Sequence, residues 1–197
     1  MHIIAATKNK GKIKEIEKIF GDLGIDVITV DEAGLDVDVE ETGASFLENS
    51  LIKARAISMF CDDIVLADDS GLCVDALGGR PGVHSARYAG ENATDEEKIE
   101  KLLCELGDEE NRSAKFVTSV AVIFPDGKEI TAMGEVEGHI LQKAEGTNGF
   151  GYDPIFFCDE LQKSFAIATD DEKNSVSHRG RALKNMYEKI KEYLNAQ

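Results

Sequence analysis

Apolar residues recur along the chain with two spacings, which predict alternating strands and helices. Short continuous apolar runs predict strands at residues 3–7, 26–30 and 64–68. Apolar positions three and four residues apart predict helices after residue 12, from Ser45 to about Phe60, from Thr94, and from about His178. Residues 116–124 and 129–136 flank the turn sequence Pro-Asp-Gly-Lys, which predicts a β-hairpin. This order indicates an α/β protein.

Two of the helices also carry start signals. Ser45 with Glu48, and Thr94 with Glu97, have the spacing of capping boxes. No repeat or linker interrupts the pattern across residues 1–197. We therefore expect a single domain with a mixed central β-sheet flanked by helices, arranged as two lobes around a substrate cleft.

Composition narrows the range of partners. The chain has 22 Lys and Arg against 38 Asp and Glu, a formal charge of −16, which argues against nucleic acid as a partner. The four cysteines follow no metal-binding or redox spacing, so we expect reduced core thiols in a cytoplasmic protein. No apolar run is long enough to span a membrane.

Two adjacent acids, Asp68 and Asp69, follow the apolar run at residues 64–67 and precede Ser70 and Gly71. If the strand ends there, both carboxylates lie at its carboxyl end, where α/β folds bind ligands. A divalent cation between them would relieve their repulsion. Ordinary turn chemistry explains Asp-Ser-Gly equally well.

Two further segments suit a phosphate and a metal. The turn at residues 7–12 joins a strand to a helix and carries Lys12, which suits phosphate, although it lacks the Walker A spacing. An exposed lysine-rich turn is the alternative. Glu41 and Lys53 flank and occupy the second helix; if Glu41 approaches Asp68 and Asp69, three carboxylates would hold magnesium and Lys53 would meet the phosphates.

The most specific pattern is the glycine-rich loop Gly146–Pro154, followed by Lys173, His178 and Arg179. Its aromatic face at Phe150 and its carboxylate at Asp153 could clamp a nucleobase by stacking and hydrogen bonding. A surface loop anchored by its aromatic residues is the alternative.

These segments together closely resemble the inosine triphosphate pyrophosphatase family. The shared motifs occur in the order TKNKGK, EETGASFLENSLIKAR, ADDSGLCVDALGGRPGVHSARYAG, GTNGFGYDPIF and EKNSVSHRGRAL, and span Thr7 to Leu183. Members hydrolyse deaminated purine nucleoside triphosphates to the monophosphate and pyrophosphate. His84 stands where many relatives carry tyrosine, and no role is based on it.

The resemblance implies a role for each matching residue. Glu41 and Asp69 would bind one Mg²⁺ per subunit, which Mn²⁺ could replace, and Asp69 would orient or deprotonate the attacking water, supported by Asp68. The triphosphate would be held by Thr7, Asn9, Lys12, Lys53, Lys173, Ser70 and Gly71. Phe150 would stack on the base, and Asp153, His178 and Arg179 would contact its edge. Gly151, Tyr152 and Asp68 are also expected to bind the substrate. The resemblance also suggests a homodimer.

Base selectivity follows from hydrogen bonding. A 6-oxo purine, as in ITP, dITP or XTP, offers an acceptor to donors such as Arg179 or His178, whereas adenine would oppose them with an amino group. Guanine also has a 6-oxo group, so its exclusion must act at C2. Two alternatives remain: a magnesium pyrophosphatase for other nucleotides, and a nucleotide-binding regulatory module without turnover.

Overall fold

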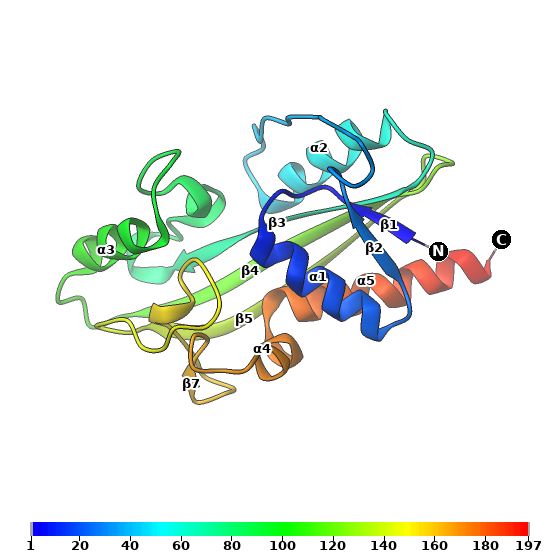
Figure 1. The fold of residues 1–197 in the computed structure, drawn as a ribbon. Helices are drawn as coiled ribbons and strands as arrows, with labels where there is room; N and C mark the ends of the chain where they lie inside the picture. The colour runs from blue at the N-terminus through cyan, green and yellow to red at the C-terminus, as the bar shows by residue number, and fades with distance from the viewer. Residues whose placement is uncertain (1, 197) are drawn as a thin grey trace. The chain divides into compact units, whose positions relative to one another are not determined.

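The computed structural model describes residues 2–196, which form a mixed β-sheet with helices on its faces (Figure 1). The strands are β1 (His2–Ala5), β2 (Asp26–Thr29), β3 (Ile64–Val74), β4 (Ser113–Ile123), β5 (Glu129–Ile140), β6 (Phe156–Cys158) and β7 (Lys163–Ser164). The α-helices are α1 (Lys10–Asp22), α2 (Phe46–Ser58), α3 (Asp95–Leu106), α4 (Asp170–Val176) and α5 (His178–Asn195). Three short 3-10 helices are η1 (Asp75–Leu77), η2 (Gly82–Arg87) and η3 (Asp153–Ile155). Among the described helices, none has the length and apolarity needed to cross a membrane.

The sheet has seven strands in the order β2-β1-β3-β4-β5-β6-β7. β1 pairs in parallel with β2 and β3, whereas β6 pairs antiparallel with β5 and β7. β4 and β5 are neighbours joined by a tight turn, in which the Phe124 amide donates to the Lys128 carbonyl at 3.0 Å. A connection this short joins antiparallel strands, so the hairpin and the mixed α/β sheet are confirmed.

The chain divides into two compact units. The first comprises residues 1–69, 118–134 and 179–197, and the second comprises residues 70–117 and 135–178. The boundaries fall inside β3, β4 and β5, because each of these long strands contributes residues to both units. The expectation of a single functional domain over the whole chain stays a prediction.

The first unit buries apolar residues on both faces of its strands. One core contains the apolar faces of α1 and α5, including Phe20 and Met186, with Leu66 and Val120 from the strands. The other contains Ala54 and Ile57 of α2, with neighbouring strand residues such as Val65. α1 and α5 therefore cover one face and α2 covers the opposite one (Figure 1).

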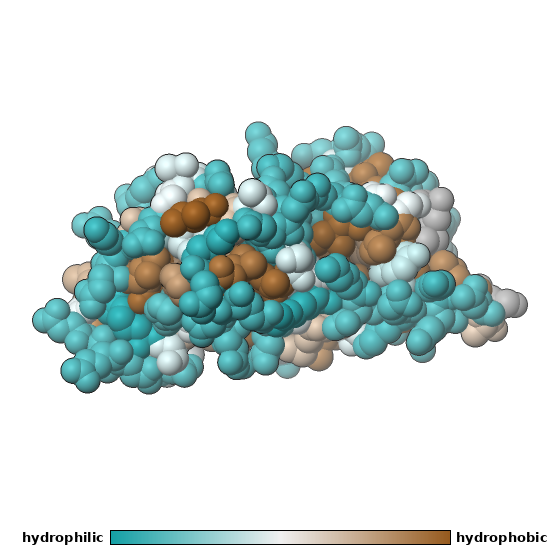
Figure 2. All heavy atoms as spheres, turned by 90° about the horizontal axis from the view of Figure 1, so that it is seen from below, coloured by the Kyte–Doolittle hydropathy of each residue, from teal (hydrophilic) through white to brown (hydrophobic). Residues whose placement is uncertain are grey.

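The second unit has a single core that is rich in aromatic rings. Phe116, Phe156 and Phe165 pack together, with ring centroids 4.6 to 6.1 Å apart. Leu102 and Leu106 of α3 complete this core. Polar residues cover most of the face seen in Figure 2, with apolar residues in smaller patches between them.

Local capping explains most helix starts. Thr94 and Glu97 form the expected capping box of α3, and Thr169 with Glu172 forms an additional one at α4. At α2 only half of the expected box is present. Ser45 accepts from the Glu48 amide, but the Glu48 carboxylate accepts from Ala44.

Two expectations from the sequence are wrong. β3 does not end at Asp68; it continues to Val74, so Asp68, Asp69, Ser70 and Gly71 are strand residues, not a turn. The cysteines are free thiols, as expected, but Cys104 is exposed and only Cys158 is fully buried. Cys104 lies on α3, whose apolar face is formed by Leu102 and Leu106 instead.

Candidate functional site

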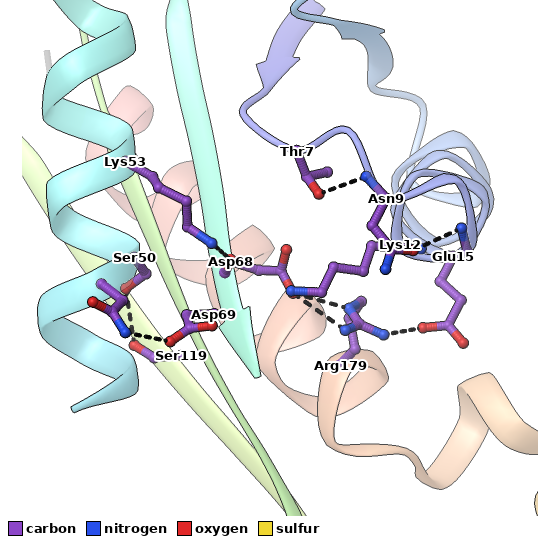
Figure 3. Close-up of polar contacts among 12 residues, drawn as sticks. Thr7, Asn9, Lys12, Glu15, Ser50, Lys53, Asp68, Asp69, Ser119 and Arg179 are labelled. Atoms are coloured by element: carbon purple, nitrogen blue, oxygen red, sulfur yellow. Dashed lines mark hydrogen bonds and ion pairs between the residues drawn. The ribbon is translucent and has the colours of Figure 1, made fainter. Parts of the chain in front are cut away.

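Asp68 and Asp69 point to opposite faces of β3 (Figure 3). Successive strand residues alternate between faces, so Asp68 lies on the side of α1 and α5, and Asp69 on the side of α2. The two carboxylates therefore do not hold one cation between them. The expected site of three carboxylates is also wrong: among the described residues, no group of three or more acids, histidines and cysteines could hold a metal.

Asp68 belongs to a buried network of charges. Its Oδ2 accepts from Nζ of Lys12 at 3.1 Å and from Nε and Nη2 of Arg179 at 3.2 Å each. Arg179 Nη1 also donates to Glu15 of α1. Burial would raise the pKa of Asp68, but the charges of Lys12, Arg179 and Lys53 outweigh it and hold the pKa well below its usual range. Asp68 is therefore expected to be ionised at neutral pH.

Asp69 lies in a different environment. Its side chain is buried, and its Oδ2 accepts from Nδ2 of Asn49 on α2 at 3.0 Å. Burial raises the pKa of Asp69, and the nearby charge of Glu41 raises it further, against the effects of Lys53 and Lys12. A carboxylate with a raised pKa is a stronger base, and Asn49 fixes its orientation.

Lys53 links Glu41 to the peptide group that precedes Asp69, and the charges of Glu41 and Lys53 act on the Asp69 carboxylate. Lys53 Nζ lies 2.7 Å from Glu41 Oε1 and donates to the backbone oxygen of Asp68 at 2.6 Å. Glu41 is partly exposed, so one of the two carboxylates is accessible to solvent. Two carboxylates supported by a lysine fit Mg²⁺, which commonly takes one or two protein carboxylates together with waters and substrate phosphates.

The turn before α1 is held by its own side chains. Asn9 caps the helix, because its Oδ1 accepts from the amides of Gly11 at 2.9 Å and Lys12 at 3.1 Å. Thr7 Oγ1 accepts from the Asn9 amide. The cap directs Lys12 towards Asp68 (Figure 3), and burial lowers the pKa of Lys12.

In the second unit, Phe150, Asp153 and Lys173 form one cluster. Lys173 Nζ lies 2.6 Å from Asp153 Oδ2, and both side chains are almost completely buried. The same ammonium group lies over the Phe150 ring, 4.7 Å from its centroid. Asp153 Oδ2 also accepts from the Phe150 amide at 2.9 Å. Lys173, expected to meet the triphosphate, therefore lies with the residues expected to meet the base.

The remaining predicted substrate-binding residues differ in their surroundings. The His178 ring stacks on Phe116 with centroids 4.8 Å apart. Tyr152 is buried and donates its hydroxyl to the Ser85 carbonyl at 3.0 Å, so it anchors the loop. Ser70 and Gly71, expected to meet the triphosphate, are strand residues of the second unit. Arg179 belongs to the first unit with Asp68, and its contact with a base edge stays a prediction.

The sequence interpretation missed three polar residues. Asn49 orients Asp69, Glu15 pairs with Arg179, and Asp95 accepts from the Gly151 amide. Glu15 lies three residues after Lys12 in α1, so helical spacing could have placed it beside Lys12. No local signal indicates Asp95, which is 56 residues from Gly151.

The chain is similar to known proteins in both sequence and structure over nearly its whole length. The sequence profile described as the Ham1 family matches residues 3–189. A dITP/XTP pyrophosphatase of Bacillus anthracis is 47% identical over 195 residues, covering 97% of this chain and 96% of its own length. One of Bacillus subtilis strain 168 is 48% identical over 185 residues, covering 93% of each chain. The structure of the Staphylococcus aureus Ham1 protein superposes with a TM-score of 0.87 at 42% identity, covering 98% of this chain and all of its own.

Proposed function

Because the chain belongs to the Ham1 family, we propose that it is an enzyme that hydrolyses deaminated purine nucleoside triphosphates, as the names of its relatives suggest. The substrates would be ITP, dITP and XTP, and the products the nucleoside monophosphate and pyrophosphate. The observation that carries the proposal is the buried Asp69, oriented by Asn49 and next to the backbone group that Lys53 links to Glu41. Such a carboxylate can accept a proton from water.

Residues of the first unit would bind the phosphates and the metal. Glu41 and Asp69 would hold Mg²⁺, or Mn²⁺ in its place, which when bound neutralises phosphate charge and polarises the phosphate groups. Lys12 and Lys53 supply positive charge in a protein whose formal charge is −16. Thr7 and Asn9 would present the turn before α1 to the phosphates, as the family resemblance implies.

Asp69 would orient the attacking water and accept its proton. The water oxygen adds to phosphorus, the anhydride bond to pyrophosphate breaks, and the proton passes to the Asp69 carboxylate. Asp68 would act indirectly. The Asp68 carboxylate forms ion pairs with Lys12 and Arg179. Because of its ion pair with Asp68, Lys12 stays close to β3.

Residues of the second unit would bind the base. Phe150 offers a face for stacking, and Lys173 and His178 are buried groups that can donate to the 6-oxo oxygen. Adenine has an amino group at that position, so binding it would leave a buried donor unpaired. Asp153 holds Lys173 and the Phe150 amide with one oxygen.

A substrate panel tests the proposal. Steady-state hydrolysis of ITP, dITP, XTP, GTP and ATP with Mg²⁺ should give kcat/KM values far higher for the first three than for ATP, with pyrophosphate as a product. Equal activity on all five would contradict the proposal, as would higher activity on dUTP when this pyrimidine nucleotide is added to the panel. Binding of ITP without turnover would support a regulatory module instead.

The proposal also includes a cytoplasmic location and a homodimer. The four free cysteines suit a reducing compartment. The homodimer rests on the family resemblance, and light scattering of the purified protein gives its mass directly.

A further inference from the structure

The glycine-rich loop that carries Phe150 is anchored at both ends. At its start, the amides of Thr147 and Asn148 both donate to the Ala166 carbonyl, at 3.2 and 3.0 Å. At its end, the Tyr152 hydroxyl donates to the Ser85 carbonyl. Phe150 therefore lies in the middle of a loop with fixed ends.

Asp95 holds the loop at the residue after Phe150. It is the first residue of α3, and its Oδ2 accepts from the Gly151 amide at 2.6 Å. Its Oδ1 lies 2.6 Å from Lys98 Nζ, which orients the carboxylate from within the same helix. Asp95 is thus a partly buried, charged acceptor for one loop amide.

This bond has a direct consequence for Phe150. The Phe150 amide donates to Asp153 and the Gly151 amide donates to Asp95, so the peptide groups on both sides of the Phe150 Cα are held. Two fixed peptide planes leave the Phe150 backbone little freedom to turn. Gly151 itself has a φ of +62°, a conformation that side chains disfavour, so the loop needs glycine there.

We propose that Asp95 is a positioning residue for base recognition, acting through the Gly151 amide to hold the Phe150 ring where it stacks on the purine. This inference rests on the proposed function, because it assigns the base to Phe150. Asp95 itself does not touch the substrate. Its effect is on the orientation of the ring, and therefore on KM. Because the Lys173 ammonium group lies over this ring, a displaced ring would also change how the base faces Lys173, and so weaken the preference for ITP over ATP.

Three variants separate this role from a general effect on α3. Asp95→Ala removes the acceptor, and Asp95→Asn keeps an acceptor oxygen but loses the charge. Glu96→Ala is the matched control, because Glu96 is an exposed acid in the same first turn with the same favourable position on the helix dipole. Thermal unfolding of each variant confirms that it is folded before its kinetics are compared.

Asp95→Ala should raise KM for ITP and lower the ITP to ATP ratio of kcat/KM by about tenfold, with a smaller change in kcat. In Asp95→Asn, KM for ITP and the ITP to ATP ratio of kcat/KM should both stay close to the wild-type values. In Glu96→Ala, both should equal the wild-type values. Hydrogen exchange of the Gly151 amide, followed by NMR, should accelerate at least about tenfold in Asp95→Ala and stay slow in Glu96→Ala.

The proposal is overturned if folded Asp95→Ala keeps wild-type selectivity, or if its Gly151 amide exchanges at the wild-type rate. It is also overturned if Glu96→Ala changes the selectivity and the Gly151 exchange rate as much as Asp95→Ala does. It is also overturned if Asp95→Asn is as impaired as Asp95→Ala. A wild-type enzyme without preference for ITP would refute the proposed function instead, and the Gly151 exchange rate would still show whether Asp95 holds the loop.

Discussion

Asp68 and Asp69 are adjacent in β3, yet their carboxylates lie on opposite faces of the strand and have different partners (Figure 3). Asp68 is compensated by Lys12 and Arg179, and Asp69 accepts from Asn49. Their pKa values are accordingly displaced in opposite directions, down for Asp68 and up for Asp69. The two acids therefore suit different tasks, one structural and one chemical.

Replacing Asp69 by Asn should stop the chemical step. The amide keeps the shape of the side chain but can neither accept the proton of water nor contribute charge to a metal. We expect kcat for ITP to fall by at least about a hundredfold, with a smaller change in KM. Asp75→Asn, at an exposed acid in η1, is the control. Near-native turnover by Asp69→Asn would show that Asp69 does not activate the attacking water.

Arg179 has two candidate roles, which one variant separates. Arg179→Met removes the guanidinium group that pairs with Asp68 and Glu15, leaving buried carboxylates without it. We expect the free energy of unfolding to fall by about 3–5 kcal/mol, and kcat/KM for ITP and ATP to fall by similar factors. Urea unfolding and steady-state kinetics measure both. A strong loss of the ITP preference would instead support the contact with the base edge that the sequence predicts.

The two lysines Lys53 and Lys173 should respond differently to substitution by alanine. Lys53 lies beside Glu41 and β3, where a point charge serves any triphosphate, so Lys53→Ala should lower kcat/KM for ITP and ATP alike. Lys173 pairs with Asp153 and covers Phe150, so Lys173→Ala should reduce the ITP to ATP ratio by about tenfold. If the ITP to ATP ratio of kcat/KM is unchanged in Lys173→Ala, Lys173 contacts the triphosphate, as the family resemblance implies, and not the base.

Removal of divalent cations should abolish turnover. A triphosphate and a protein of formal charge −16 repel each other, and Glu41 and Asp69 fit a magnesium ion. Activity in excess EDTA should fall to background and return with Mg²⁺ or Mn²⁺. We also expect activity to rise towards alkaline pH, since water then loses its proton more easily. Full activity in EDTA would exclude the metal requirement.

The stability of the fold should depend on the ionisation of Asp95. Burial raises the pKa of Asp95, but hydrogen bonds from Lys98 and Gly151 outweigh it and lower the pKa in the folded protein. A lowered folded-state pKa stabilises the fold above the unfolded-state value of about 3.9, and this contribution is lost as the pH falls through the folded-state pKa. The stability difference between wild type and Asp95→Asn, from urea unfolding, should therefore shrink below about pH 4. If the difference in unfolding free energy between wild type and Asp95→Asn is constant from neutral to acid pH, the ionisation of Asp95 does not stabilise the fold.

The sequence by itself determined most of the long elements of the fold and the inventory of chemical groups, but not the extent of β3 or the short elements β6, β7 and α4. Helical spacing and caps such as Thr94 with Glu97 act within one turn, and a hairpin turn acts within five residues, so local patterns are sufficient to predict them. The motifs likewise singled out the acids, lysines and aromatic loop to which the family resemblance assigns roles. These features depend on neighbouring residues only.

Only the tertiary structure decided which groups meet. Arg179 lies 111 residues from Asp68 and 164 from Glu15, and Asp95 lies 56 residues from Gly151, so nothing local specifies these pairs. The separation of Asp68 from Asp69 depends on β3 continuing past both, and the short apolar run in the sequence does not show that continuation. Strand alternation then sends one carboxylate to α1 and α5 and the other to α2, because a pleated strand directs successive side chains to opposite faces.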